Sequence, residues 1–305
     1  MQCDEGNRRQ WPPAHASCAP ASSGSSRRRP QDRQAPAAHQ PPRTSFPSHA
    51  EGPTMSNSRF VEVVEDLERT LLDFIRKHGV THSEYRQATD LIIDSIKAGE
   101  ESLLFDVFFE AGATDVDNAD LEGSMAAIEG PFYLEGAPLL QAPHVLPQRP
   151  AEKGDTLVFR GIVRTPDNTV LAGAELDMWQ ADADGLYSNI HPDIPDWNLR
   201  GRFTTAEDGS FEVTTIVPPP YEIPKGGPTG RVLNGLGRHF FRPAHLHLKV
   251  RADGFRELTS QLYFKDGDYL GSDVASAVRD GLIVELERTD SGYEARYDFV
   301  LEPRR

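Results

Sequence analysis

The stretch Pro218–Val250, PPPYEIPKGGPTGRVLNGLGRHFFRPAHLHLKV, ends in a clear strand pattern. In its last residues, His245 and His247 alternate with aliphatic side chains. Alternation with a period of two residues is typical of a β-strand with one buried face. We therefore expect a half-buried strand that carries both imidazoles on the same face, where they could share a metal ion.

Other short runs with strand character surround this stretch. About seven short strands separated by turn residues favour a β-sandwich of antiparallel sheets. The sequence contains no Gly-rich nucleotide-binding loop and no alternation of strands with helices. We expect residues 128–305 to form this sandwich. The expected strands cover residues 156–164, 174–180, 211–217, 245–251, 258–264, 283–287 and 297–301.

The region before the sandwich has a helical period. Apolar residues from Phe60 onward recur at three- and four-residue steps, Thr81 and Glu84 have the spacing of a capping box, and a third apolar run covers residues 103–109. A helical layer of about fifty residues is too thin to be stable alone. We therefore expect residues 55–127 to form a small helical domain that packs on the sandwich or on a second subunit. The predicted fold class is mainly β with an α-helical N-terminal layer.

The first 54 residues differ in composition. They are rich in Pro, Ser, Gln and Arg and contain almost no aliphatic side chains. Such a segment cannot bury enough apolar surface to offset the cost of ordering it. We expect residues 1–54 to be disordered, or to be translated from nucleotides upstream of a true start at Met55.

Composition excludes several classes of function. The 32 Lys and Arg against 47 Asp and Glu give a net charge of −15, which argues against nucleic-acid binding. No apolar run approaches the ~20 residues that a membrane helix needs, and no secretory signal is present, so we expect a cytoplasmic protein without membrane insertion. The only cysteines are Cys3 and Cys18. Any metal site after residue 54 must therefore use His, carboxylate or Tyr.

Four side chains are candidate metal ligands: Tyr187, Tyr221, His245 and His247. Imidazole suits several transition metals, and phenolate is a hard anionic donor that favours a trivalent ion, so two of each would indicate Fe(III). The residue pattern alone leaves a plainer alternative open. A His-x-His pair is more often two solvent-facing histidines on an edge strand.

The tyrosines have a plain alternative as well. A tyrosine in such a chain is usually a half-buried ring at the end of a strand. We expect Tyr263 and Tyr297 to be of this kind.

Several motifs together resemble those of one enzyme family. They are IEGPFYLEGAP (residues 128–138), ADADGLYSN (181–189), WNLRGRF (197–203), the Pro218–Val250 block and SQLYF (260–264). In this order and spacing they resemble the intradiol ring-cleaving dioxygenases, in the branch of catechol, chlorocatechol and hydroxyquinol 1,2-dioxygenases. The helical region from Phe60 also resembles the N-terminal dimerisation domain of that family, so the resemblance covers nearly everything after Met55.

The resemblance implies roles for the candidate residues. It makes Tyr187, Tyr221, His245 and His247 the ligands of one non-haem Fe(III) per subunit, with Tyr221 as the phenolate that leaves when substrate binds. It also implies that Arg242 stabilises charge on the substrate and that Gln261 lies near the iron. The same resemblance implies a homodimer, with a phospholipid as a further ligand at the helical interface. From residue type alone, Arg242 could be a surface arginine in a turn, and Gln261 an ordinary strand residue.

The resemblance also implies the reaction. We expect dioxygen to cleave catechol to cis,cis-muconate in aromatic-compound degradation, with chlorocatechol as the alternative substrate and hydroxyquinol after it. One substituent shifts discrimination in an apolar pocket by only ~1–3 kcal/mol, so residue types do not decide between these substrates. The pocket wall implied by family position comprises Leu103, Asp106, Val107, Ile128, Pro131, Phe132, Ile223, Pro224, Val274 and Ala275.

Two other interpretations are weaker. An Fe(II) oxygenase with two histidines and one carboxylate needs an acid soon after the HLH triplet, but Leu248–Arg251 contains none. A transthyretin-like β-sandwich that only binds a partner would not need all four ligand positions.

Overall fold

The computed structural model describes residues 57–304. Among them, residues 57–89 belong to one compact unit and residues 90–304 to another. The expectation for residues 1–54 lies outside the described residues. The domain boundary after residue 127 stays a prediction.

Two helices begin the described chain. α1 spans Asn57–His78, and α2 spans His82–Ala98. The predicted capping box is confirmed, because the backbone amide of Thr81 donates to Glu84 Oε2 at 2.8 Å and the amide of Glu84 donates to Thr81 Oγ1 at 3.3 Å. These reciprocal bonds satisfy amides that a helix start leaves without partners. Within residues 57–304, no helix is long and apolar enough to cross a membrane.

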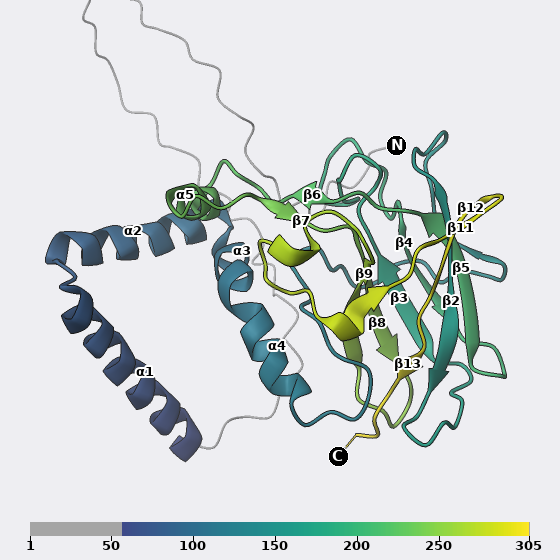
Figure 1. Cartoon of the computed structure of the whole chain (residues 1–305), viewed down its shortest axis with the longest axis horizontal. Coiled ribbons are helices and arrows are strands. Elements are labelled where there is room, and N and C mark those ends of the chain that lie inside the picture. The colour runs from purple at the N-terminus through teal and green to yellow at the C-terminus, as the bar shows by residue number, and fades with distance from the viewer. Residues whose placement is uncertain (1–56, 305) are drawn as a thin grey trace, which may run out of the picture. The chain divides into compact units, whose positions relative to one another are not determined.

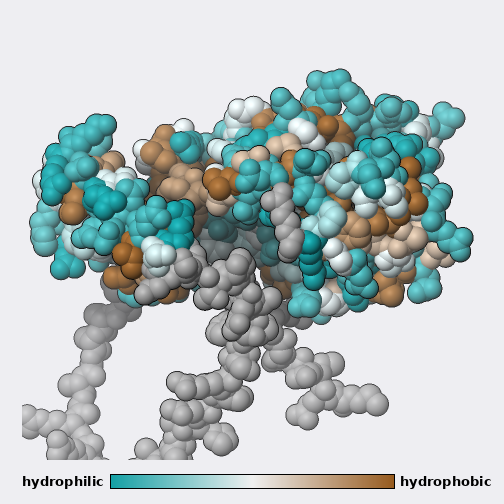
Figure 2. Space-filling view, turned by 90° about the horizontal axis from the view of Figure 1, so that it is seen from below, coloured by the Kyte–Doolittle hydropathy of each residue, from teal (hydrophilic) through white to brown (hydrophobic). Residues whose placement is uncertain are grey.

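The apolar stripe of α1 is exposed. Phe60, Leu67, Leu71 and Phe74 each expose between 52% and 56% of their surface. Brown apolar side chains interrupt the teal polar surface of the helical part at the left of Figure 2. Exposed apolar stripes of this size normally mark a surface that another molecule covers.

The predicted third apolar run lies in a sequence of short helical segments. α3 (Glu101–Phe105) continues through a π-helical turn, η1 (Asp106–Glu110), into α4 (Ala111–Asn118). Leu103, Val107 and Ala111 are buried. Figure 1 shows α3 and α4 on the side of β8 and β9 that faces away from β2 and β5.

Two sheets form the predicted sandwich, which is thereby confirmed (Figure 1). One sheet has the order β10-β9-β8-β3-β4, and the other has the order β1-β5-β2-β12-β11 with β13 also paired to β2. A short ribbon, β6-β7, and the helix α5 (Pro228–Gly235) lie in the connection before β8. The strands span His144–Val145 (β1), Thr156–Arg164 (β2), Glu175–Trp179 (β3), Arg200–Thr204 (β4), Ser210–Ile216 (β5), Tyr221–Glu222 (β6), Phe241–Arg242 (β7), His245–Arg251 (β8), Leu258–Phe264 (β9), Ile283–Val284 (β10), Glu287–Thr289 (β11), Gly292–Arg296 (β12) and Phe299–Val300 (β13).

The pairing is mixed and not purely antiparallel as predicted. β8 pairs antiparallel with both β3 and β9, and β2 pairs antiparallel with β5. However, β1 with β5, β10 with β9, and both β12 and β13 with β2 are parallel. Of these parallel partners, β1 and β10 lie at sheet edges, whereas β12 lies between β2 and β11, and β13 adds to the end of β2. Strands β4 and β12 were not predicted, and neither were the two-residue strands β1, β6 and β7 or most of β11.

The strand β8 is buried on both faces, so the expectation of a half-buried strand was wrong. Leu246 and Leu248 point into the core between the sheets and have no exposed surface. His245 and His247 point the other way and are also buried. This second face is covered by the loop after residue 127 and by α3, which the alternating pattern could not reveal.

Candidate metal centre

The two imidazoles of β8 converge on one point. The Nε2 atoms of His245 and His247 face each other at 2.9 Å, and the rings meet at 66°. The predicted placement on one face is therefore confirmed. Two neighbouring nitrogen lone pairs that face a common point are suited to sharing a cation.

A backbone contact fixes the tautomer of His245. Its Nδ1–H donates to the carbonyl of Pro243 at 2.7 Å, which leaves the lone pair of Nε2 free. Burial, assisted by the charge of Arg242, lowers the pKa of His245 to about 3. Burial also lowers the pKa of His247 well below its ordinary value, with His245 contributing. Both rings are therefore neutral near pH 7, which is the form that binds metals.

Tyr221 and Tyr187 stand beside this pair. Tyr221 begins β6 and is paired in register with Arg242 of β7. The Tyr187 ring lies 5.5 Å from the Tyr221 ring at 77° and 6.1 Å from the His247 ring. The Tyr221 ring lies 5.6 Å from the His245 ring. All four predicted ligands thus come together from three separate segments of the chain.

A tight turn delivers Tyr187. Asp182 Oδ1 accepts the backbone amides of Asp184 and Leu186, both at 2.9 Å, and Gly185 adopts a left-handed φ of +81°. A carboxylate that accepts nearby amides in this way stabilises the turn without regular secondary structure. The turn directs the next side chain, Tyr187, into the protein.

The donor atoms fit a cation. The hydroxyl of Tyr187 is buried and has no hydrogen-bond partner among the described residues. Leaving such a group unpaired costs ~1–3 kcal/mol. Burial raises the pKa of both Tyr187 and Tyr221, so neither phenol ionises near neutral pH without a positive partner. Two neutral imidazoles and two phenols form a donor set suited to Fe(III).

Aromatic packing holds the second imidazole. The His247 ring stacks on Trp179 with 4.7 Å between ring centres and 13° between the planes. Trp179 is the register partner of His247 across β3 and β8, and it is almost fully buried. Local sequence does not single out this tryptophan, because its contact with His247 arises from strand pairing.

Arg242 and Gln261 meet beside the ligands. Arg242 Nη2 donates to Gln261 Oε1 at 2.9 Å and to the Tyr263 hydroxyl at 2.9 Å, and Arg242 Nε donates to Asp273 Oδ1 at 3.1 Å. Burial alone would lower the pKa of Arg242, but Tyr263 and Asp273 raise it above its ordinary value. Arg242 is therefore a fixed buried cation and not a surface arginine.

Tyr263 differs from its expectation. We expected a half-buried ring at a strand end, but Tyr263 has no exposed surface, and its hydroxyl donates to Gln261 Oε1 at 2.6 Å. The covered outer face of β9 explains the difference. Tyr297 is partly buried, as expected, and its hydroxyl donates to the Gly281 carbonyl at 3.2 Å.

A second buried arginine, Arg200, holds the ligand loop. Its Nε donates to Ser188 Oγ at 3.0 Å, its Nη2 to the Ser188 carbonyl at 3.2 Å, and its Nη1 to the Phe132 carbonyl at 2.8 Å. Its guanidinium lies 5.8 Å from the Tyr187 ring centre. Burial lowers the pKa of Arg200 to about 10, so it remains charged near pH 7. Sequence analysis did not identify this residue.

The loop after residue 127 closes the site. Gln261 Nε2 donates to the Ile128 carbonyl at 2.7 Å, and the amide of Glu129 donates to Glu110 Oε1 at 2.8 Å. A Cβ atom on Gly130 would lie 3.7 Å from Cε1 of His247. The loop is therefore fastened on two sides and lies directly against a ligand ring.

The predicted pocket residues fall into three groups. Leu103, Val107, Phe132, Ile223 and Val274 share one apolar cluster with Tyr187 and Tyr221. Ile128 and Ala275 share a second, smaller cluster with Ala111 and Ala277. Asp106, Pro131 and Pro224 are only partly buried. The first cluster also contains Trp179, Ala181 and Leu233, which were not predicted.

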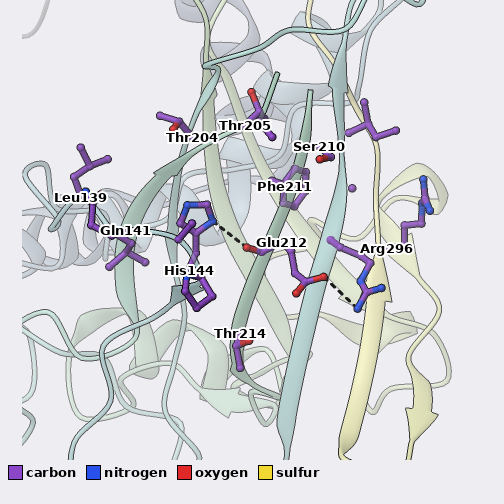
Figure 3. Close-up of a pocket in the computed structure, with 17 residues that line it drawn as sticks. Leu139, Gln141, His144, Thr204, Thr205, Ser210, Phe211, Glu212, Thr214 and Arg296 are labelled. Atoms are coloured by element: carbon purple, nitrogen blue, oxygen red, sulfur yellow. Dashed lines mark hydrogen bonds and ion pairs between the residues drawn. The ribbon is translucent and has the colours of Figure 1, made fainter. Parts of the chain in front are cut away.

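A groove of about 700 Å³ lies elsewhere, along β1, β2, β4 and β5 (Figure 3). Two of its polar residues contact each other or a neighbouring strand. Nδ1 of His144 lies 3.0 Å from the Glu212 carbonyl oxygen, and the Glu212 carboxylate pairs with Arg160 at 3.3 Å. None of the four candidate ligands lines this groove.

Comparison with known proteins assigns the family. The family profile described as Dioxygenase matches residues 128–303. The chlorocatechol 1,2-dioxygenase of Rhodococcus opacus is 42% identical over 255 residues, which cover 81% of this chain and 99% of the relative. The chain belongs to the intradiol dioxygenase family. It is thus an intradiol ring-cleaving enzyme that acts on a catechol-type substrate with dioxygen.

Two further comparisons support this intradiol dioxygenase assignment. The crystal structure of 3-chlorocatechol 1,2-dioxygenase from Rhodococcus opacus 1CP matches with a TM-score of 0.78 and 42% identity, covering 82% of this chain and all of that chain. Catechol 1,2-dioxygenase 2 of Acinetobacter lwoffii is 34% identical over 241 residues, which cover 77% of this chain and 87% of the relative.

These findings bear on the substrate expectation and on the two weaker interpretations. The relatives favour the chlorocatechol alternative over unsubstituted catechol. The family assignment contradicts the interpretation as a binding module. Within residues 57–304, no group of three or more His, Cys, Asp or Glu side chains is placed to hold a metal, so the two-histidine, one-carboxylate site is not formed there.

Proposed function

We propose that this intradiol dioxygenase binds one non-haem Fe(III) and acts preferentially on chlorinated catechols. One observation carries the iron assignment: two neutral imidazoles and two buried phenols converge, and the Tyr187 hydroxyl lacks a partner among the described residues. The higher identity to a chlorocatechol relative than to a catechol relative supports the substrate assignment.

In this proposal Tyr187, Tyr221, His245 and His247 hold the iron. Fe(III) held there would supply Lewis acidity that lowers the pKa of the catechol hydroxyls, so that the substrate would bind as the electron-rich catecholate. The neutral state of both histidines leaves their nitrogen lone pairs available. The two buried phenols provide anionic oxygens once a cation balances their charge.

Tyr221 is positioned to move a proton. Burial raises the pKa of its phenol, but the nearby Arg242 pulls that pKa in the opposite direction. Because burial and the positive charge of Arg242 act on this pKa in opposite directions, the phenol can change its protonation state when the net charge around it changes. With iron held at the site, Tyr221 would be a phenolate, and its Oη would take a proton from one substrate hydroxyl as the substrate binds.

Arg242 stabilises the reacting ring. Its guanidinium is buried and fixed by Asp273, Gln261 and Tyr263. A preorganised cation in a site of low polarity stabilises negative charge that develops during reaction, and removal of one such group typically costs about 10²–10³-fold in kcat. The loop from Ile128 to Phe132 is attached beside this charge, because the Ile128 carbonyl accepts a hydrogen bond from Gln261 Nε2 at 2.7 Å.

The apolar wall selects the ring substituent. Leu103, Val107, Phe132, Ile223 and Val274 present aliphatic and aromatic surface beside the two tyrosines. Chlorine is apolar and comparable in size to a methyl group, so this wall suits a chlorinated ring. One such substituent contributes ~1–3 kcal/mol to discrimination.

The visible absorption spectrum tests the iron assignment. Iron-loaded protein should show a broad tyrosinate-to-Fe(III) charge-transfer band that shifts when catechol is added without oxygen. Tyr187→Phe should weaken this band, whereas Tyr297→Phe serves as the matched control and should not. A colourless iron-loaded protein that does not respond to catechol would contradict the assignment.

Steady-state kinetics test the substrate. We expect kcat/KM for 3-chlorocatechol or 4-chlorocatechol to exceed that for catechol by at least about tenfold. A clear preference for catechol would instead support the substrate favoured by the sequence. Hydroxyquinol should be the poorest of the four, because its additional hydroxyl would face an apolar wall.

We also propose that residues 55–127 form the dimerisation domain of a homodimer. The exposed apolar stripe of α1 supports this role. A phospholipid at the helical interface is part of the same proposal, and mass spectrometry of an organic-solvent extract of the purified protein would test it.

A further inference from the structure

The carboxylate of Asp273 pairs with Arg242, the proposed catalytic arginine. It is buried, and its two oxygens accept four hydrogen bonds. Arg242 Nε donates to Oδ1 and Arg242 Nη2 to Oδ2, both at 3.1 Å. The backbone amide of Ala275 donates to Oδ1 at 3.2 Å, and that of Ala277 donates to Oδ2 at 3.0 Å. One carboxylate therefore binds both the buried cation and the chain that follows it.

A backbone bond joins the same two segments. The amide of Val274 donates to the carbonyl of Phe241 at 3.1 Å, and Phe241 precedes Arg242 in β7. The segment 273–277 is thus attached to β7 by main chain and side chain together. Arg242 therefore cannot move relative to the segment 273–277 without breaking these hydrogen bonds.

The attached segment is part of the proposed pocket wall. Val274 belongs to the apolar cluster that contains Tyr187 and Tyr221. Ala275 and Ala277 pack in the neighbouring cluster with Ile128. Both the cation and the wall beside the proposed substrate therefore depend on the same carboxylate.

We propose that Asp273 is a positioning residue that fixes Arg242 relative to residues 274–277 of the proposed pocket wall. Because one carboxylate holds both, it couples the stabilisation of negative charge by Arg242 to the recognition of the ring substituent by the wall. This inference rests on the proposed function. It concerns residues that do not ligate the iron, so it can fail while the iron assignment stands.

The substitution Asp273→Asn tests the coupling. All four contacts of the carboxylate are donors, and an amide replaces one acceptor oxygen with another donor. We expect Arg242 and the wall to lose their fixed places and kcat for the preferred chlorocatechol to fall about 10–100-fold. The kcat/KM ratio of chlorocatechol to catechol should fall towards one. Asp268→Asn, at an exposed aspartate of the same connection, is the matched control and should change neither quantity.

Two readouts separate positioning from general damage. Iron content and the charge-transfer band before substrate addition should remain as in the wild type, since Asp273 does not touch the four ligands. The shift of that band on anaerobic titration with chlorocatechol should require a higher concentration. Loss of iron together with loss of activity would overturn the proposal in favour of a structural role.

A double-mutant cycle identifies the residue through which Asp273 acts. In an Arg242→Gln background, Asp273→Asn should reduce kcat less than about twofold further, because its effect is transmitted through the arginine. Multiplicative losses in the double variant would overturn the proposal. The double variant also removes the unpaired buried cation, so it remains informative if Asp273→Asn alone does not fold.

Tyr263→Phe independently removes another of the contacts that hold Arg242. It removes the hydroxyl bonded to Arg242 and Gln261 without leaving a charge unpaired. We expect a several-fold loss of kcat, and the kcat/KM ratio of chlorocatechol to catechol should again fall towards one. Unchanged kinetics in both Tyr263→Phe and Asp273→Asn would refute the inference. The proposed function would still stand if the wild-type enzyme shows the iron band and turnover.

Discussion

A Cβ atom on Gly185 would lie 2.9 Å from the Cβ atom of Tyr221. Gly185 also has a left-handed φ of +81°. The turn that precedes one proposed iron ligand, Tyr187, therefore packs directly against Cα and Cβ of the other tyrosine ligand, Tyr221. Glycine is required at this position for two separate reasons, conformation and space.

Gly185→Ala should destabilise the iron-free protein by about 2–5 kcal/mol, since left-handed strain costs ~1–2 kcal/mol and overpacking adds ~1–3 kcal/mol. Urea-induced unfolding measures this change. The displaced Tyr221 should also weaken the charge-transfer band of the iron-loaded protein. Gly173→Ala separates the two causes, because Gly173 has a φ of +72° but no atom within 4 Å of the added Cβ. Equal losses in both variants would show that the contact with Tyr221 is unimportant.

Arg200→Lys should cost about 3 kcal/mol of unfolding free energy. The lysine cannot reproduce the fork that bonds the carbonyls of Ser188 and Phe132, and buried acceptors without donors are costly. Because Ser188 follows Tyr187, the variant should also bind iron more weakly in a chelator competition. Arg202→Lys, at a more exposed arginine of the same strand face, should change stability by less than about 1 kcal/mol. Similar effects at both positions would argue against a role for Arg200 in holding the ligand loop.

Local patterns predicted much of the fold. The bounds of β2, β8 and β9 agree with the expected runs because strong alternation and flanking turns fix them. The strand β4 was missed because its sequence, RGRFT, places two arginines where an apolar alternation was sought. Arg200 is buried there only because Ser188 and the Phe132 loop fold over it, which is a tertiary event.

The candidate site was predicted to a similar degree. The four proposed ligands were selected because their motifs resemble those of the intradiol family, whereas the residue pattern alone left a plainer alternative open, and the structure brings all four together. Asp273 and Tyr263 could not be selected, since an aspartate in a turn and a tyrosine on a strand are ordinary locally. Their significance comes from contacts with Arg242, which lies 31 and 21 residues away in sequence.

Leu71→Glu should convert the proposed homodimer into a monomer. Leu71 lies on the exposed apolar stripe of α1, and a charge buried in an apolar interface is strongly unfavourable. Sedimentation or light scattering at micromolar concentration measures the mass. Glu68→Gln, at an exposed polar position of the same helix, is the control and should leave the mass unchanged. A wild-type protein that is monomeric would contradict the proposed role of this stripe.

Acid should destabilise the iron-free protein through its buried histidines. The folded state holds the pKa of His245 at about 3, against 6.5 for an ordinary histidine, so between these values the unfolded state binds a proton that the folded state does not. Stability is therefore complete above pH 6.5 and falls as the pH is lowered, by ~1.4 kcal/mol per pH unit for this histidine. His247 contributes in the same direction. Chemical unfolding from pH 7 to pH 4.5 measures the slope, and His245→Gln should reduce it by about that amount. An unchanged slope in the variant would mean that His245 is not neutral and buried in the folded iron-free protein.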